Sequence, residues 1–155
     1  MHLDLDHRHP GRGVTVAART LAQTTTGDTI GPVTLNVGRE TLVAYANASG
    51  DQNPIHQDED FAKSVGLPDV IAHGMWTMGA SATVVTDWAG DAGRVVEFGT
   101  RFTKPVVVPV GGNELVVQGV VKAVDVETGR VTVDVTTTCE GEKVLGRCIA
   151  VVRLD

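Results

Sequence analysis

Residues 74–88 form the most apolar helix candidate in the sequence, and its centre, Gly79-Ala80-Ser81-Ala82, consists of small side chains. A helix that is apolar on nearly every face has to be buried on most sides. Small side chains also let neighbouring elements approach it closely. A single antiparallel sheet curled around one long helix would cover it in this way, so we expect the rest of the chain to supply the strands.

Four segments that follow this helix have the composition of strands. They are enriched in β-branched residues, alternate partly between apolar and polar positions, and cover residues 94–104, 114–126, 130–139 and 143–154. Ahead of the helix, the sequence predicts a short strand at residues 33–37 and two helices at residues 39–49 and 58–65. Helices followed by a run of consecutive strands predict an α+β fold and not a βαβ repeat.

The length of 155 residues fits one domain. We expect this domain to span residues 19–155. Residues 1–18 are predicted to be a disordered tail, because the first stretch lacks periodicity and is interrupted by Gly and Pro. A start of translation at Val14 is an alternative explanation of this tail.

Composition excludes several classes of protein. A formal net charge of −6 argues against a nucleic-acid surface, which needs clustered Lys and Arg. The sequence contains no uninterrupted apolar stretch of about 18 residues and no apolar segment typical of a secretory signal, so we expect a cytoplasmic protein. No glycine-rich phosphate-binding motif is present, and no nucleotide cofactor is expected. Cys139 and Cys148 are predicted to be reduced cysteines that fill strand positions.

Asp51 and His56 lie five residues apart across the Asn53-Pro54 turn. Histidine titrates near neutral pH, and an adjacent carboxylate can fix its tautomer or share its proton, so the pair suits general acid–base chemistry. Asn53 is expected to hold the loop through hydrogen bonds to nearby backbone, and Pro54 to restrict Asn53 to extended geometry. Asp51 or His56 alone would be interpreted as a turn or loop residue. Their combination favours the catalytic interpretation.

Gly74 opens the apolar helix, where backbone N–H groups have no partner within the helix and carry partial positive charge. Glycine also lets a carbonyl group approach without obstruction by a Cβ atom. The Gly74 amide is therefore a candidate oxyanion site. We interpret His73 as a buried structural residue beside this site, and Met75 as a second supporting residue.

The stretch Ser49-Gly50-Asp51-Gln52-Asn53-Pro54-Ile55-His56, followed by Ala72-His73-Gly74-Met75, resembles the MaoC-like or R-specific hydratase family of hot-dog folds. The resemblance runs from about residue 27 to residue 154, and within the family it points to the catalytic B subunit of the mycobacterial (3R)-hydroxyacyl-ACP dehydratases. It implies a hot-dog fold, an antiparallel β-sheet wrapped around a long central α-helix. It also implies that two such sheets join side by side across a dimer.

The same resemblance implies a hydro-lyase that reversibly dehydrates (3R)-hydroxyacyl thioesters of coenzyme A or acyl-carrier protein, in fatty-acid or mycolic-acid-like elongation. Asp51 and His56 would handle the protons, while the Gly74 amide would stabilise negative charge on the thioester oxygen. Neither a metal nor a cofactor is required. Which member of the pair removes the C2 proton is left open, because a coupled pair titrates jointly.

Further residues are candidates for substrate contacts. Trp76 is a candidate for lining an acyl channel, with core packing as the alternative. Arg94, Arg101 and Lys104 are candidates for contacting the phosphates of the carrier, with solvated strand positions as the alternative. Some family members have a serine on the central helix near the acyl chain, and the sequence does not decide between Thr77 and Ser81.

Two other functions compete with the dehydratase. One is a thioesterase on the same fold, in which a carboxylate activates water against the carbonyl carbon. The other is a non-catalytic subunit that binds an acyl chain. The presence of both Asp51 and His56 argues against these alternatives. A homodimer and a heterodimer with a related hot-dog subunit are equally compatible with the sequence.

Overall fold

The structure is a computed structural model that describes residues 18–155. The start of translation at Val14 and nearly all of the predicted tail lie outside the described residues. The helices are α1 (Arg39–Ser49), α2 (Glu59–Ser64) and α3 (Gly74–Ala89), with three 3₁₀ turns, η1 (Leu21–Gln23), η2 (Pro54–His56) and η3 (Ala92–Arg94). None of the helices in residues 18–155 has the length and apolar character needed to cross a bilayer.

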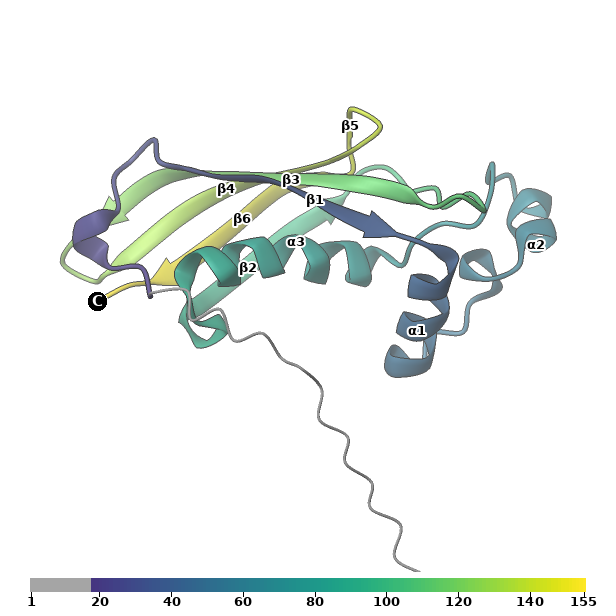
Figure 1. Cartoon of the computed structure of the whole chain (residues 1–155), viewed down its shortest axis with the longest axis horizontal. Helices are drawn as coiled ribbons and strands as arrows, with labels where there is room; N and C mark the ends of the chain where they lie inside the picture. Colours follow the sequence, from purple (N-terminus) through teal and green to yellow (C-terminus); the bar gives the residue numbers. More distant parts are fainter. Residues whose placement is uncertain (1–17) are drawn as a thin grey trace, which may run out of the picture.

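The strands form one antiparallel sheet of six strands with the order β1-β3-β4-β6-β2, and β5 pairs with β4. Their bounds are β1 (Thr29–Val37), β2 (Val95–Phe102), β3 (Asn113–Asp125), β4 (Arg130–Cys139), β5 (Glu142–Lys143) and β6 (Leu145–Arg153). Three of the pairings contain register shifts, which bend strands and increase their twist. Figure 1 shows the resulting sheet lying over α3, with α1 and α2 beyond one end of that helix. The predicted α+β architecture is confirmed.

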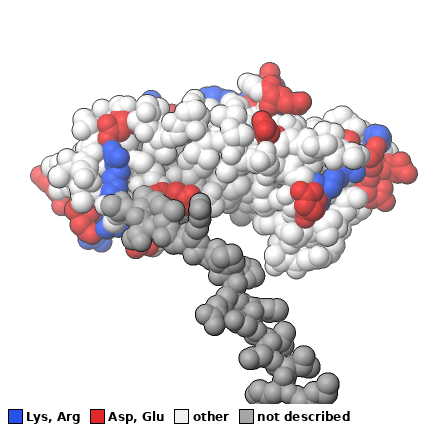
Figure 2. Space-filling view, in the orientation of Figure 1, with Lys and Arg blue, Asp and Glu red and all other residues white. Residues whose placement is uncertain are grey.

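Helix α3 is covered by the sheet along one side only. Thr77, Ser81 and Val85 are buried against the strands, whereas Gly79 and Thr83 on the opposite face are exposed. The expectation that the helix is enclosed on most sides is therefore wrong for the single chain. Its small side chains leave an open and nearly uncharged face. Figure 2 agrees with this, since charged residues gather toward the two ends of the molecule and few lie in the middle of the face shown.

The core is built from valine and other aliphatic residues, as the low aromatic content predicts. Burial alternates along β4, where Val131, Val133 and Val135 point inward. Cys139 and Cys148 are both buried and unpaired, and burial raises the pKa of each thiol. Cys139 pairs with Glu142 across a hairpin that turns tightly at Glu140 and Gly141, both of which have positive φ.

Helix α1 is anchored to the segment that leads into α3. The Arg39 guanidinium donates through Nη2 to Asp69 Oδ1 at 2.7 Å and through Nε to the carbonyl oxygen of Val108 at 3.0 Å. Gly50 ends the helix with a left-handed backbone conformation at φ 80°, which glycine adopts without strain. These anchors place the loop after α1 directly beside the start of α3.

Candidate active site

The loop from Asp51 to His56 is held by its own side chains. Asn53 has the extended backbone geometry that a following proline favours, with φ −57° and ψ 125°, and its Oδ1 accepts a hydrogen bond from the Ile55 amide at 3.2 Å. The backbone N–H of Asn53 in turn donates to Oδ1 of Asp51 at 3.2 Å. One carboxylate oxygen of Asp51 is thus engaged locally, while Oδ2 is left facing His56.

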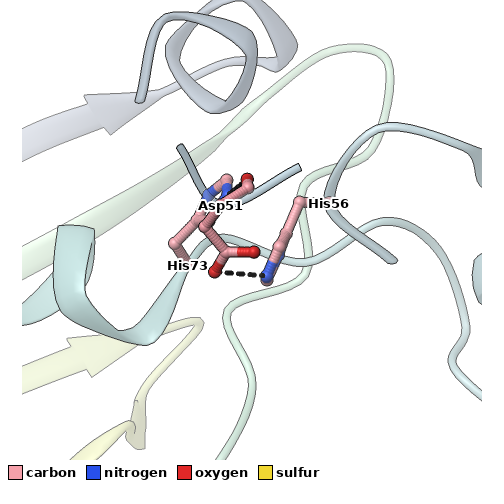
Figure 3. Close-up of side chains that lie close together, drawn as sticks. All are labelled: Asp51, His56 and His73. Carbon is pink, nitrogen blue, oxygen red and sulfur yellow. Dashed lines mark hydrogen bonds and ion pairs between the residues drawn. The ribbon is translucent and has the colours of Figure 1, made fainter. Parts of the chain in front are cut away.

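The imidazole of His56 is buried, and its tautomer follows from its backbone contact. Nδ1 lies 2.7 Å from the carbonyl oxygen of Ile71, which can only accept, so Nδ1 carries the hydrogen. In the neutral ring, Nε2 then has a free lone pair. Nε2 lies 4.0 Å from Asp51 Oδ2 (Figure 3). This separation is too long for a direct hydrogen bond but leaves room for a bridging oxygen.

His73 lies against both members of this pair. Its ring stacks on that of His56 with centroids 3.7 Å apart, and Nε2 lies 3.1 Å from the carbonyl oxygen of Asp51. On its other side the ring is tilted against Tyr45, with a centroid distance of 4.8 Å. His73 is only 2% exposed, and its Nδ1 has no hydrogen-bond partner among the described residues.

The surroundings of His56 favour its neutral form. Burial is the main cause that lowers the pKa of His56 below its ordinary value of 6.5, and the nearby His73 lowers it further. The hydrogen bond to Ile71 and the charge of Asp51 raise the pKa, but less than burial lowers it. The side chain of Asp51 is 53% exposed and therefore faces solvent more than its partner does.

Gly74 begins α3 immediately next to this pair. Among the described residues, its amide has no acceptor, as expected for the first turn of a helix. The ring of Phe102 packs over it, since a Cβ atom on Gly74 would lie 3.1 Å from that ring. The space above the amide is therefore narrow.

Two cavities meet at the site. One has a volume of about 380 Å³ and the other about 370 Å³. His56 lines the larger cavity, together with Thr77 and a set of buried aliphatic side chains. Asp51 lines the smaller cavity, together with Tyr45, His73 and Met75.

The structure gathers most of the predicted site residues but not all of them. Lys104 lines the larger cavity and is ion-paired with Glu142. Arg101 is exposed on β2 and lines neither cavity. Arg94 lies beyond the opposite end of α3, where it donates to the carbonyl oxygen of Arg19 and pairs with Asp155.

The side chains that line the channel differ in part from those the sequence suggested. Trp76 packs against the core and lines neither cavity at the site. Of the two hydroxyl candidates, Thr77 lines the larger cavity, whereas Ser81 is buried and bonded to Thr137 at 2.8 Å. Sequence reasoning missed Phe102. No local pattern marks this residue, which reaches the site at the end of β2.

Asp51, His56 and His73 have ligand atoms within 4.8 Å of one another, a spacing that a metal ion could bridge. In the tautomers set by the backbone carbonyls, only Nε2 of His56 and Nδ1 of His73 have free lone pairs. A metal ion would therefore need these two atoms and a carboxylate oxygen of Asp51.

Comparison with known proteins identifies the family of this chain. The model of the MaoC-like domain matches residues 18–143. The 3-hydroxyacyl-thioester dehydratase X of Mycobacterium tuberculosis is 41% identical over 75 residues, which cover 48% of this chain and 26% of that protein. The chain thus spans about a quarter of the length of this relative.

Solved structures agree in fold. A MaoC-like dehydratase superposes with a TM-score of 0.87 at 37% identity, covering 89% of this chain and 43% of the other. The C-terminally truncated HadBC (3R-hydroxyacyl-ACP dehydratase) complex from Mycobacterium tuberculosis superposes with a TM-score of 0.63 at 22% identity, covering 82% of this chain and 96% of the other. These likenesses confirm the predicted hot-dog architecture. The chain belongs to the family of MaoC-like domains.

Proposed function

We propose that this chain is a hydro-lyase that reversibly dehydrates (3R)-hydroxyacyl thioesters, and in the reverse direction an R-specific hydratase of trans-2-enoyl thioesters. The observation that carries the proposal is the 4.0 Å gap between His56 Nε2 and Asp51 Oδ2 beside the start of α3. Family membership and the name of the mycobacterial relative support the same reaction class.

The gap has the polarity that a water molecule requires. Both atoms that face it are acceptors when His56 is neutral and Asp51 is ionised, and one water has two hydrogens to donate. In hydration, one acceptor takes a proton from this water while the oxygen bonds to C3. Negative charge then moves to the thioester oxygen, which the Gly74 amide stabilises. The stored proton is finally delivered to C2, so H and OH have been added across the double bond.

Dehydration is the same sequence in reverse. One member of the pair removes the C2 proton, and the C3 hydroxyl leaves as water after protonation. The amide of Gly74 again stabilises the oxyanion between these steps. The protein begins and ends in the same protonation state, and because the substrate only gains or loses water, the reaction needs no oxidant or reductant.

The test compares wild type with Asp51→Asn and His56→Ala, using crotonyl-CoA and longer trans-2-enoyl-CoA substrates. Loss of the enoyl-thioester absorbance measures hydration, and a thiol reagent measures released coenzyme A. We expect absorbance loss without thiol release, and a decrease in kcat of at least about a hundredfold in each variant. Asp60→Asn, at an exposed position on α2 that lines neither cavity, is the matched control and should retain activity.

Two results would contradict the proposal. Thiol release at the rate of substrate loss would identify a thioesterase instead. Unchanged turnover in both variants would remove Asp51 and His56 from the chemistry.

We also propose that the functional unit contains a second hot-dog chain. The strand β2 lies at the edge of the sheet and pairs on one side only, with β6, and the face of α3 around Gly79 and Thr83 is open. Either a copy of this chain or a related subunit would cover these surfaces. Size-exclusion chromatography of the chain expressed alone and with neighbouring genes distinguishes the two, and a monomer under both conditions would contradict the proposal.

The carrier and the cellular location are further parts of the proposal. The carrier is either coenzyme A or acyl-carrier protein. A phosphate contact by Lys104 is not part of the proposal, because Lys104 lines the larger cavity and is ion-paired with Glu142. Rates with enoyl thioesters of both carriers would identify the preferred one. A cytoplasmic location and a role in fatty-acid elongation stay predictions.

A further inference from the structure

Phe102 stands at the boundary between the two cavities. It is the last residue of β2, where the pairing with β6 has just shifted register between Gly99 and Arg101. Phe102 is 54% exposed, so its ring is accessible to a ligand or a partner. Its ring lies against Gly74, at the first turn of α3.

Gly74 and Phe102 are the two residues that line both cavities. The proposed acid and base are divided between them, because His56 lines the larger cavity and Asp51 lines the smaller one. A substrate whose C2 and C3 atoms are to reach both groups must therefore lie across the boundary. Its reacting atoms would lie next to Phe102 and Gly74, where the two cavities meet.

The two cavities differ in their lining. The larger one includes four aliphatic side chains that are almost completely buried, Ala72, Val106, Val144 and Leu145, beside the exposed Thr103, Lys104 and Pro105. The smaller one is lined mainly by polar and aromatic residues and includes no buried aliphatic side chain. An acyl chain gains most from leaving water against the aliphatic wall of the larger cavity, and a polar carrier arm fits the smaller one.

We propose that Phe102 is a specificity-determining residue that separates the acyl end of the substrate from the carrier end and sets the width of the passage between them. This inference rests on the proposed function. The planar enoyl thioester would lie beside the aromatic ring, where the two cavities meet. The acyl chain would extend into the larger cavity, and the pantetheine arm would leave through the smaller one.

The proposal is tested with unreactive ligands, so that binding is measured apart from catalysis. The affinities of butanoyl-, octanoyl- and dodecanoyl-CoA are measured by calorimetry for wild type, Phe102→Ala and Phe102→Leu. Truncating the ring removes contacts that every ligand makes and enlarges the larger cavity, which Phe102 lines and which a longer acyl chain fills more completely. We expect Phe102→Ala to change the ratio of the Kd values for the shortest and longest ligands by about tenfold or more in favour of the longest, with Phe102→Leu between it and wild type.

Phe61→Ala is the matched control, because Phe61 is a similarly exposed phenylalanine on α2 and lines neither cavity. It should keep the wild-type ratio. The inference is overturned if Phe102→Ala keeps that ratio as well, or if wild type binds none of the three ligands. Failure of the proposed function looks different: wild type and the variants would bind acyl-CoA with the expected pattern, while wild type would not hydrate any enoyl-CoA.

Discussion

The imidazole rings of His56 and His73 are stacked, with centroids 3.7 Å apart and planes inclined by 24°. His73 also contacts the carbonyl oxygen of Asp51 through Nε2, at 3.1 Å. One buried ring therefore touches both halves of the proposed acid–base pair. Because one of its nitrogens is engaged by the Asp51 carbonyl oxygen and its ring by the His56 ring, we expect His73 to position the pair.

Two substitutions of His73 separate these contacts. His73→Phe keeps a flat ring for stacking but loses the donor to Asp51, whereas His73→Gln retains a donor group and loses the stacked ring. We expect kcat to fall by about tenfold or more in both, because small misplacements of catalytic groups are costly. Both also remove a neighbour that lowers the pKa of His56, so the acid limb of the pH–rate profile should move to higher pH. Tyr45→Phe is the control, and an unmoved limb in both His73 variants would contradict this role.

The pH dependence of wild type follows from the neutral state of His56. Burial lowers its pKa below 6.5, so the basic form persists as the pH falls through 6.5. We expect the acid limb of kcat/KM to lie below pH 6.5, measured with crotonyl-CoA. An acid limb above pH 6.5 would contradict this expectation, because it would mean that the pKa of His56 in the free enzyme is raised and not lowered.

The lowered pKa of His56 also predicts that the folded protein loses stability as the pH falls. Below pH 6.5 the unfolded chain binds a proton at His56 before the folded chain does, because the folded-state pKa is the lower one. This contribution therefore reduces the free energy of unfolding as the pH falls from 6.5 to the folded-state pKa, and becomes constant below it. Urea unfolding of wild type and His56→Gln at several pH values isolates this contribution. The free energy of unfolding of the two proteins should change differently with pH only between 6.5 and the folded-state pKa of His56.

Gly74→Ala tests the space above the amide. The added Cβ atom would lie 3.1 to 3.3 Å from atoms of the Phe102 ring, while the N–H group is retained. We expect a decrease in kcat/KM of about tenfold or more with little loss of stability, since alanine is the better helix former. Adding Phe102→Leu should restore part of the activity by giving the methyl group room. An equal loss in the double variant would show that steric conflict with Phe102 is not the cause.

Ser81 and Thr137 form a buried hydrogen bond between α3 and β4 whose direction can be inferred. Ser81 Oγ donates to the carbonyl oxygen of Thr77 at 2.8 Å, so the Thr137 hydroxyl must donate to Ser81, also at 2.8 Å. Ser81→Ala leaves that donor buried without an acceptor and should cost about 1–3 kcal/mol in the free energy of unfolding.

Thr137→Val removes the donor itself and should cost less, and the double variant should be no less stable than Ser81→Ala alone. Chemical denaturation of the three variants measures the coupling. Additive losses would mean that Ser81 is not the acceptor.

Local patterns in the sequence were enough to predict the elements. The periodicity of residues 39–49 and the glycine after it predict α1 with its observed bounds, because helix formation and termination depend on neighbouring residues. The same holds for β4, where alternating valines mark the buried face. The octad from Ser49 to His56 also placed the candidate acid and base on one short loop, since five residues of constrained chain cannot carry them far apart.

The remaining features depend on contacts between residues far apart in the chain, which no local pattern records. The stacking of His73 on His56 depends on how the loop after α1 meets the start of α3. The placement of Phe102 beside Gly74 depends on the path of β2 along the helix. The open face of α3 likewise depends on which side the sheet covers. The sequence by itself determined the elements and the chemical groups available, whereas only the tertiary structure decided which groups meet, because side-chain packing and burial act across the whole fold.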